Sequence, residues 1–225
     1  RVSFSVRDLP GSPEYLFHLE AGAPERTIRA PREAAILGRV LLADGRPATS
    51  FELHFDWGER LERDGLLIGD ASSNFQPRRL PGGRFEVRRL APGKRRLAVR
   101  AEGSALEIVE GIELAAGEEK ELTVELKAGG SVRCRVIDPR GPLPAVAVSL
   151  VVPLERPSWL GDSASRLFRR WLRPQPDGTW FVPGVGPRPC SIAIDLGAAG
   201  RVELDAVVVR DGETVEVERR VKVSR

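Results

Sequence analysis

Apolar and polar residues alternate over many short stretches of this chain, whereas the longer period of an amphipathic helix is nearly absent. A period of two is what a strand with one buried face requires. The alternation predicts strands at residues 36–42, 85–87, 97–99, 106–114, 121–126, 132–137, 146–152, 180–182, 191–194, 202–209 and 214–223. Clusters of Gly, Pro and Asp separate these stretches, which favours β-sandwiches with many tight turns.

The pattern repeats itself at a spacing of about 95 residues. Residues 40–48 correspond to residues 136–145, and residues 83–87 (Gly-Arg-Phe-Glu-Val) correspond to residues 178–182 (Gly-Thr-Trp-Phe-Val). The repeat also aligns two sets of alternating apolar residues: Phe51, Leu53 and Phe55 with Val148, Leu150 and Val152. The chain is therefore expected to contain two copies of one structural unit in tandem.

The repeat predicts two β-sandwich modules, at residues 34–128 and 129–225, after a shorter segment at residues 1–33. Residues 4–11 resemble residues 85–92, so we interpret the shorter segment as a partial module, the back half of an upstream repeat. Half a sandwich would expose its apolar face. We therefore expect this segment to dock on the first module or to add a strand pair to one of its sheets.

Short motifs mark the turns and strand starts of the first module: Gly38-Arg39-Val40, Asp44-Gly45, Gly83-Arg84-Phe85, Leu90-Ala91-Pro92-Gly93 and Gly117-Glu118. In this order and spacing they resemble the carboxypeptidase regulatory-like domain. The second module matches less tightly, with Cys134 at the place of Gly38 and Arg188 at the place of Gly93. The resemblance covers about four-fifths of the chain.

The resemblance implies an all-β fold, in which each module is a seven-stranded antiparallel β-sandwich of transthyretin-like type. The motifs are turn and strand residues, so they specify a fold rather than a chemistry. The family pattern carries no catalytic residues and no cofactor. Domains of this family resemble accessory modules of secreted enzymes, adhesins and surface proteins, so an extracytoplasmic location (secreted, periplasmic or cell-surface) is implied as well.

Aromatic residues begin two of the predicted strands, and the alternation predicts that they are buried. Phe85 shares a strand face with Val87, and Trp180 shares one with Val182. The same alternation predicts that the side chains of Cys134 and Cys190 point into the core. The sequence leaves two alternatives for this pair, a disulfide between opposing sheets or two buried thiols.

Composition narrows the range of functions. Hydrophobic residues make up 41% of the 225 residues, and 35 basic side chains face 32 acidic ones, for a net charge of +3. Nucleic-acid-binding proteins usually show a stronger, one-sided charge, so no nucleic-acid partner is expected. No apolar run is long enough to span a bilayer, so no membrane insertion is expected. Because the sequence contains no Met, we expect it to be a piece of a longer protein.

Residues that could carry out chemistry are sparse. The two histidines, His18 and His54, are far apart in the sequence, and His54 is expected to be a solvated surface residue. No Cys/His spacing suits zinc, and there is no phosphate-binding loop or nucleophile elbow. We therefore expect no catalytic residues, no metal and no cofactor, and interpret the protein as a non-enzymatic one.

Tryptophan and arginine are the candidates for a ligand surface, because large aromatic rings and guanidinium groups are enriched at binding interfaces. The candidates are Trp57, Trp159, Trp171, Arg78, Arg79, Arg169 and Arg170. Residues 166–173 have the spacing of a short amphipathic helix, but the equivalent residues 75–80 read as extended. We favour a strand or an irregular sheet edge for residues 166–173.

Two functions fit these residues. In the first, the modules are a spacer and an interaction scaffold, which binds a protein partner or neighbouring domains of the same chain. In the second, the tryptophans and arginines bind a polysaccharide. A carbohydrate site should show coplanar exposed aromatic rings beside polar side chains, whereas a spacer should bury them.

Overall fold

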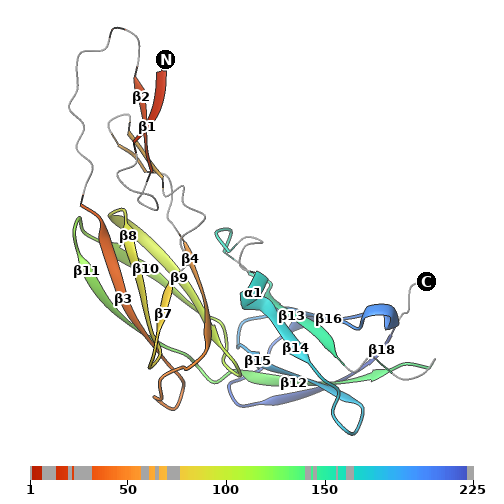
Figure 1. Ribbon diagram of the computed structural model, residues 1–225. Coiled ribbons are helices and arrows are strands. Elements are labelled where there is room, and N and C mark those ends of the chain that lie inside the picture. Colours follow the sequence, from red (N-terminus) through yellow and green to blue (C-terminus); the bar gives the residue numbers. More distant parts are fainter. Residues whose placement is uncertain are drawn as a thin grey trace. The chain divides into compact units, whose positions relative to one another are not determined.

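The computed structural model describes residues 2–6, 14–19, 22, 32–56, 61–63, 66–69, 77–139, 143, 146–155, 157–160 and 165–221. The regular structure of these residues is strand, apart from two single helical turns, α1 (Ser165–Phe168) and η2 (Gly197–Ala199). The strands assemble into five sheets (Figure 1). The predicted all-β fold class is confirmed, and each of the predicted strands is found within a few residues of its expected bounds.

The chain forms two compact units. One comprises Arg1–Val40, Phe55–Leu97 and Ile108–Val124, and the other comprises Leu41–His54, Ala98–Glu107 and Glu125–Arg225. The limits of these units differ from those of the two modules predicted from the sequence. The division into two modules therefore stays a prediction.

The first unit contains a sheet that the sequence did not predict. Its strand order is β1 (Val2–Val6), β2 (Glu14–Leu19), β6 (Leu66–Gly69) and β5 (Leu61–Arg63), and every neighbouring pair is antiparallel. The N-terminal strands therefore pair with β5 and β6, which lie within the predicted first module at residues 34–128. Of the two alternatives, a strand pair added to a sandwich sheet is not what β2 forms. The backbone N–H and C=O groups on the edge of β2 need partners, and the edge of β6 provides them.

Two sheets arise from residues 34–125. A four-stranded sheet has the order β11 (Glu119–Glu125), β3 (Ala34–Leu41), β8 (Arg84–Leu90) and β7 (Arg78–Leu80). A three-stranded sheet has the order β10 (Glu107–Leu114), β9 (Gly93–Ala101) and β4 (Phe51–Asp56). Phe85 and Val87 on β8 are buried, as the alternation predicts, and so are Leu97 and Val99 on β9.

The second unit contains the other two sheets. One has the order β15 (Thr179–Val185), β12 (Gly130–Ile137) and β18 (Thr214–Arg220). The other has the order β14 (Arg169–Leu172), β13 (Ala147–Pro153), β16 (Cys190–Asp195) and β17 (Arg201–Val207). Buried side chains from both sheets form one hydrophobic cluster, to which the fully buried Trp180 and Ile192 belong. This cluster is the core of a sandwich.

The strand register confirms the repeat at the level of single residue pairs. Gly38 lies opposite Phe85 on β3 and β8, and Cys134 lies opposite Trp180 on β12 and β15. Ile36 pairs with Val87 in the same way as Val132 pairs with Val182. Both strand pairs also contain a register shift near the start of the first strand. The sequence similarity thus reflects one local structure built twice.

The last strand of each repeat departs from the expected antiparallel sandwich. β3 and β11 run in the same direction, since the Ala35 N–H donates to the Glu118 carbonyl oxygen and the Leu126 N–H donates to the Leu41 carbonyl oxygen. β12 and β18 run parallel, with Cys134 opposite Val217. Antiparallel neighbours can be joined by a tight hairpin, whereas parallel neighbours need a long connection. The connection from β12 to β18 contains all the strands between them. It is therefore long enough for β18 to run beside β12 in the same direction.

The strand predicted for residues 166–173 is confirmed at Arg169–Leu172, whereas residues 166–168 belong to the helical turn α1. The two repeats use this segment differently. β7 pairs with β8, whereas β14 pairs with β13 in the other sheet and only Pro174 bridges back to Trp180. β7 therefore lies in the same sheet as β8, whereas β14 lies in the sheet opposite the one that contains β15.

Both cysteines are buried free thiols, which decides between the two alternatives left by the sequence. Cys134 lies in the core opposite Trp180, and the Cys190 thiol donates a hydrogen bond to the carbonyl oxygen of Val207 at 3.4 Å. Burial raises the pKa of both thiols to about 11.

These thiols are expected to react slowly while the protein is folded. At pH 9 the thiolate fraction is on the order of 1% for a pKa of about 11, against about half or more in the unfolded chain. Ellman's reagent should therefore titrate two thiols rapidly in denaturant, and more slowly without it by a factor on the order of 100. A chain with no titratable thiol in denaturant would instead contain a disulfide.

The raised thiol pKa values also predict how stability depends on pH. Well below the ordinary cysteine pKa of about 8.5 the thiols are protonated in both states and contribute no pH dependence. From about pH 8 to about pH 11 the unfolded chain loses these protons and the folded chain keeps them, so the free energy of unfolding should fall as the pH rises and level off above the folded pKa. The Cys134→Ala/Cys190→Ala double variant should show a shallower fall over the same range.

Candidate functional site

The sheet β14-β13-β16-β17 has an outward face with a row of apolar side chains along β13. Along β13, Ala147, Ser149 and Val151 are buried, whereas Val148 and Leu150 are half-buried on the opposite face. Alternation continues this outward row in both directions along the strand, and its members are Val146, Val148, Leu150, Val152 and Leu154. A strand that is apolar on both faces is typical of one that is covered on both sides.

This result corrects the sequence alignment of the two repeats. The repeat aligned Phe51, Leu53 and Phe55 on β4 with Val148, Leu150 and Val152 on β13. Phe51 and Phe55 are buried, whereas the three aligned residues of β13 lie on its outward face. The inward positions of β13 include Ser149, whose hydroxyl makes no hydrogen bond within the described part of the chain. Because both faces of β13 consist largely of small apolar residues, periodicity could not tell them apart.

Trp171 and Arg169 extend the outward face onto the edge strand β14. Trp171 pairs with Val148 and is 71% exposed, and Arg169 pairs with Leu150 and is exposed as well. Among the described residues, Arg169 makes no ion pair through its side chain. The sheet edge thus combines a large solvent-exposed ring with a cation.

Charged residues of both signs lie on β16 and β17 of the same face, where Asp195 pairs with Val148 on one side and with Arg201 on the other. Leu150 pairs with Ala193 on β16, and Ala193 pairs with Glu203 on β17, so one row runs from Arg169 to Glu203. The Glu203 carboxylate is ion-paired with the Arg201 guanidinium at 2.9 Å. The Asp205 carboxylate accepts a hydrogen bond from the Ser191 hydroxyl at 3.5 Å. We call this surface the Trp171 face, defined by Val148, Leu150, Val152, Arg169, Trp171, Ala193, Asp195, Arg201, Glu203 and Asp205.

Arg170 does not belong to the Trp171 face, although the sequence grouped it with Arg169. Successive residues of a strand point to opposite faces, so Arg170 is directed inward and is 8% exposed. Its Nη1 donates to the carbonyl oxygens of Leu167 at 2.9 Å and Arg169 at 3.2 Å. Burial, followed by the charge of Arg100, lowers the pKa of Arg170 to about 9. Arg170 is therefore largely shielded from solvent, unlike Arg169.

The other candidate tryptophans do not join Trp171 in an exposed platform. Trp159 is half-buried and stacks on His54, with ring centroids 6.0 Å apart and an interplanar angle of 17°. The expectation of a solvated His54 is therefore wrong, because the Trp159 ring covers it. Trp57 and the His18 side chain lie outside the described residues.

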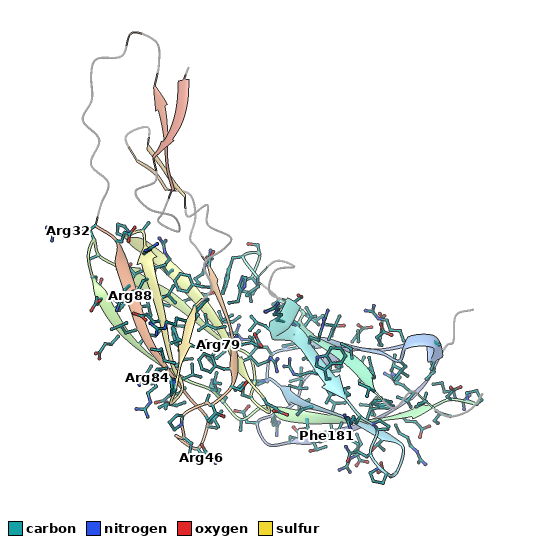
Figure 2. The ribbon with its side chains drawn as sticks, viewed as in Figure 1. Arg32, Arg46, Arg79, Arg84, Arg88 and Phe181 are labelled. Atoms are coloured by element: carbon teal, nitrogen blue, oxygen red, sulfur yellow. The ribbon has the colours of Figure 1, made fainter. Side chains whose placement is uncertain are left out.

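Arg78 and Arg79 occupy a different sheet from Arg169. Both lie on β7, where Arg78 is 3.8 Å from the carboxylate of Glu86 on β8. Arg84 and Arg88 belong to the same sheet (Figure 2), and Arg88 is ion-paired with Glu86 and Glu119. Arg78 and Arg79 stay proposed ligand residues. They lie on the edge strand β7, in a sheet with several charged side chains.

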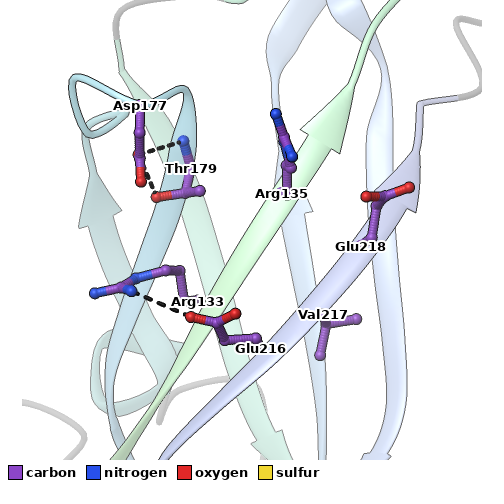
Figure 3. Close-up of a pocket in the computed structure, with 7 residues that line it drawn as sticks. All are labelled: Arg133, Arg135, Asp177, Thr179, Glu216, Val217 and Glu218. Carbon is purple, nitrogen blue, oxygen red and sulfur yellow. Dashed lines mark hydrogen bonds and ion pairs between the residues drawn. The ribbon is translucent and has the colours of Figure 1, made fainter.

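A polar groove of about 470 Å³ lies on the sheet β15-β12-β18, which sequence reasoning did not single out (Figure 3). The residues that line it are Arg133, Arg135, Asp177, Thr179, Glu216, Val217 and Glu218. Arg133 and Glu216 are ion-paired at 3.2 Å. The Asp177 carboxylate accepts hydrogen bonds from the Thr179 hydroxyl at 2.7 Å and the Thr179 N–H at 3.0 Å, which lower its pKa. The groove is shallow, open and polar, with charges that partly satisfy each other.

The described residues offer no set of side chains for a metal, since no three His, Cys, Asp or Glu residues come together there. No helix in the described part of the chain is long and apolar enough to cross a bilayer. Among the described residues, the Trp171 face is the surface with the most exposed large aromatic side chain.

Comparison with known proteins finds no family model that matches the chain and no similar curated protein. Solved structures are similar at low identity. The Bacillus anthracis TIE protein matches with a TM-score of 0.28 and 11% identity over 94% of this chain and 42% of its own length. The Legionella pneumophila phospholipase PlaB matches with a TM-score of 0.32 and 15% identity over 55% of this chain and 29% of its own.

A minor pilin of Streptococcus agalactiae matches with a TM-score of 0.32 and 13% identity, over 86% of this chain and 97% of its own. The chain thus spans less than half the length of the TIE protein and of the phospholipase. At these identities and TM-scores we draw no functional argument from the similar structures.

Proposed function

We propose that this chain consists of non-catalytic β-sandwich modules of a larger extracytoplasmic protein, which act as a spacer and as a scaffold that binds protein. The Trp171 face supports this proposal. A solvated tryptophan beside a row of outward-facing valine and leucine side chains is costly to leave in water, and such apolar surfaces favour protein contacts. The extracytoplasmic location rests on the resemblance to the carboxypeptidase regulatory-like domain.

The alternative, polysaccharide binding, has weaker support. Sugar recognition of the kind considered needs coplanar exposed rings beside hydrogen-bonding groups. Of the candidate tryptophans that the structure describes, Trp171 is exposed and Trp159 is stacked on His54. The outward neighbours of Trp171 on β13 are aliphatic, which suits a protein surface better than a sugar.

Photo-crosslinking in the cells that produce the protein tests the proposed function. A photoreactive residue placed at position 171 should form adducts with a protein chain of defined mass, whereas the same residue at the exposed Arg135 position should not. Affinity electrophoresis of the purified chain against neutral and acidic polysaccharides provides the complementary measurement. Retardation by one glycan that Trp171→Ala abolishes, without a crosslinked protein, would establish the carbohydrate alternative. The absence of both would exclude the Trp171 face as a binding surface.

A further inference from the structure

Arginine is concentrated around α1 and the edge strand β14. Residues 166–173 contain four arginines and no acidic residue. Arg100 on β9 lies against this segment within the same compact unit, where its Nη2 donates to the carbonyl oxygens of Arg169 at 3.3 Å and Arg166 at 3.4 Å. We call this group the arginine cluster, and its members are Arg100, Arg166, Arg169, Arg170 and Arg173.

No carboxylate neutralises the arginine cluster within the described part of the chain, where none of its guanidinium groups forms an ion pair. The edge strand β7 differs, because there Arg78 is 3.8 Å from the carboxylate of Glu86. The two innermost members of the cluster, Arg100 and Arg170, bind backbone oxygens instead. Both donate to the carbonyl oxygen of Arg169, at 3.3 and 3.2 Å. The Nε of Arg100 is buried and donates no hydrogen bond within the described residues.

Buried cations of this kind favour an anion nearby, since a charge that leaves water loses hydration free energy unless an opposite charge replaces it. Burial lowers the pKa of Arg100 and Arg170, and the charges of Glu52 and Glu102 only partly oppose this effect at Arg100. Arg100 and Arg170 also repel each other. The cluster therefore carries an unbalanced positive charge, which an anionic partner would relieve.

The members of the cluster that a partner can reach include one on each side of Trp171 in the chain. Arg169 and Trp171 alternate with the inward Arg170 and Leu172, and the exposed Arg173 directly follows β14. An extended chain advances by about 3.3 Å per residue, so Arg169 and Arg173 are separated by about 13 Å along the chain, with Trp171 midway. An extended partner with acidic residues at positions i and i+4 and an apolar residue at i+2 matches this spacing.

The carboxylates of the same sheet restrict such a partner to the β14 edge. Asp195 lies opposite Val148, which lies opposite Trp171, so two strand spacings of about 4.8 Å each separate Asp195 from Trp171. The aliphatic side chain of Val148 beside Trp171 favours a protein segment over an acidic polysaccharide, whose hydroxyl groups would lose hydrogen bonds to water there.

We propose, building on the proposed function, that the arginine cluster binds an acidic, extended segment of a partner protein along β14. Carboxylates of this segment pair with the guanidinium groups of Arg169 and Arg173, and an apolar side chain between them packs on the ring of Trp171. Arg100 and Arg170 add to the positive potential beside the segment. Because the pairing charges are exposed, binding should weaken as the salt concentration rises.

Fluorescence anisotropy with a labelled peptide tests this proposal. The peptide carries two glutamates four residues apart with a leucine midway, in a background of Ser and Gly, and it should bind the unaltered chain at low salt. Arg169→Glu, Arg173→Glu and Trp171→Ala should each weaken binding by about tenfold. Arg135→Glu, an exposed reversal with the same change of net charge on the other sheet of the sandwich, should leave binding unchanged. Circular dichroism of each variant establishes that it is folded.

Three outcomes would overturn the proposal. The first is the absence of peptide binding at low salt. The second is equal weakening by Arg135→Glu and Arg169→Glu, which would mean that net charge alone attracts the peptide. The third is tighter binding of an acidic polysaccharide such as polygalacturonate, lost in the same variants, which would assign the arginine cluster to a saccharide. After the first or the second outcome, a crosslink from position 171 to a protein chain would leave the proposed function intact and remove only the acidic partner.

Discussion

Trp180→Ala is expected to lower the free energy of unfolding of the second sandwich by about 3–5 kcal/mol, the usual cost of deleting a buried aromatic ring. Trp180 is fully buried, belongs to the hydrophobic cluster that joins the two sheets, and lies opposite Cys134. Its removal leaves a cavity between two strands that can move little. Urea unfolding followed by circular dichroism measures the loss.

Two further substitutions make this measurement specific. Trp180→Phe should cost only about 1–2 kcal/mol, because most of the ring contact remains and because the first module already has Phe85 at this place. The Trp180 Nε1 donates no hydrogen bond within the described residues, so the change loses no polar contact. Trp171→Ala should change the stability by less than about 0.5 kcal/mol at concentrations where the chain is monomeric. Equal effects of Trp171→Ala and Trp180→Ala would contradict the assignment of the core.

The parts of the fold that could be predicted share a physical basis. Where a strand has one apolar and one polar face, as β8 does, the alternation identifies a buried residue such as Phe85 without knowledge of the partner strand. β15 is less clear, because Phe181 and Pro183 occupy the outward positions between its buried residues. The repeat then transferred the assignment from one module to the other, and the register of Gly38 with Phe85 and of Cys134 with Trp180 agrees with it.

The candidate site could be predicted only in part, because the residue types on β13 and β14 do not indicate which side chains face the core and which face solvent. On β13 both faces are apolar, and the inward one includes Ser149, so the row that faces solvent resembles a core row. On β14 the adjacent Arg169 and Arg170 have identical chemistry, and only strand geometry separates the exposed residue from the buried one. The pairing of β2 with β6 joins residues distant in sequence, which no local pattern contains.

Gly38→Ala is expected to cost about 1–3 kcal/mol, although alanine adds only a methyl group and is usually well tolerated in strands. The ring of Phe85 lies directly over Gly38, and an added Cβ would stand 1.9 Å from the Phe85 Cζ and 2.1 Å from its Cε1. The ring must therefore move, but Phe85 is 1% exposed and the surrounding core leaves it no free space. The free energy of unfolding from urea titrations measures the cost.

A double-mutant cycle identifies the cause of this loss. Phe85→Leu removes the ring atoms that meet the new methyl group, so Gly38→Ala should cost much less in the Phe85→Leu background than in the unaltered chain. At the equivalent place in the second module, Cys134 already carries a side chain opposite Trp180, and Cys134→Ala should lose only about 1 kcal/mol of sulfur packing. The same cost for Gly38→Ala in both backgrounds would mean that the ring of Phe85 is not what excludes a side chain from residue 38.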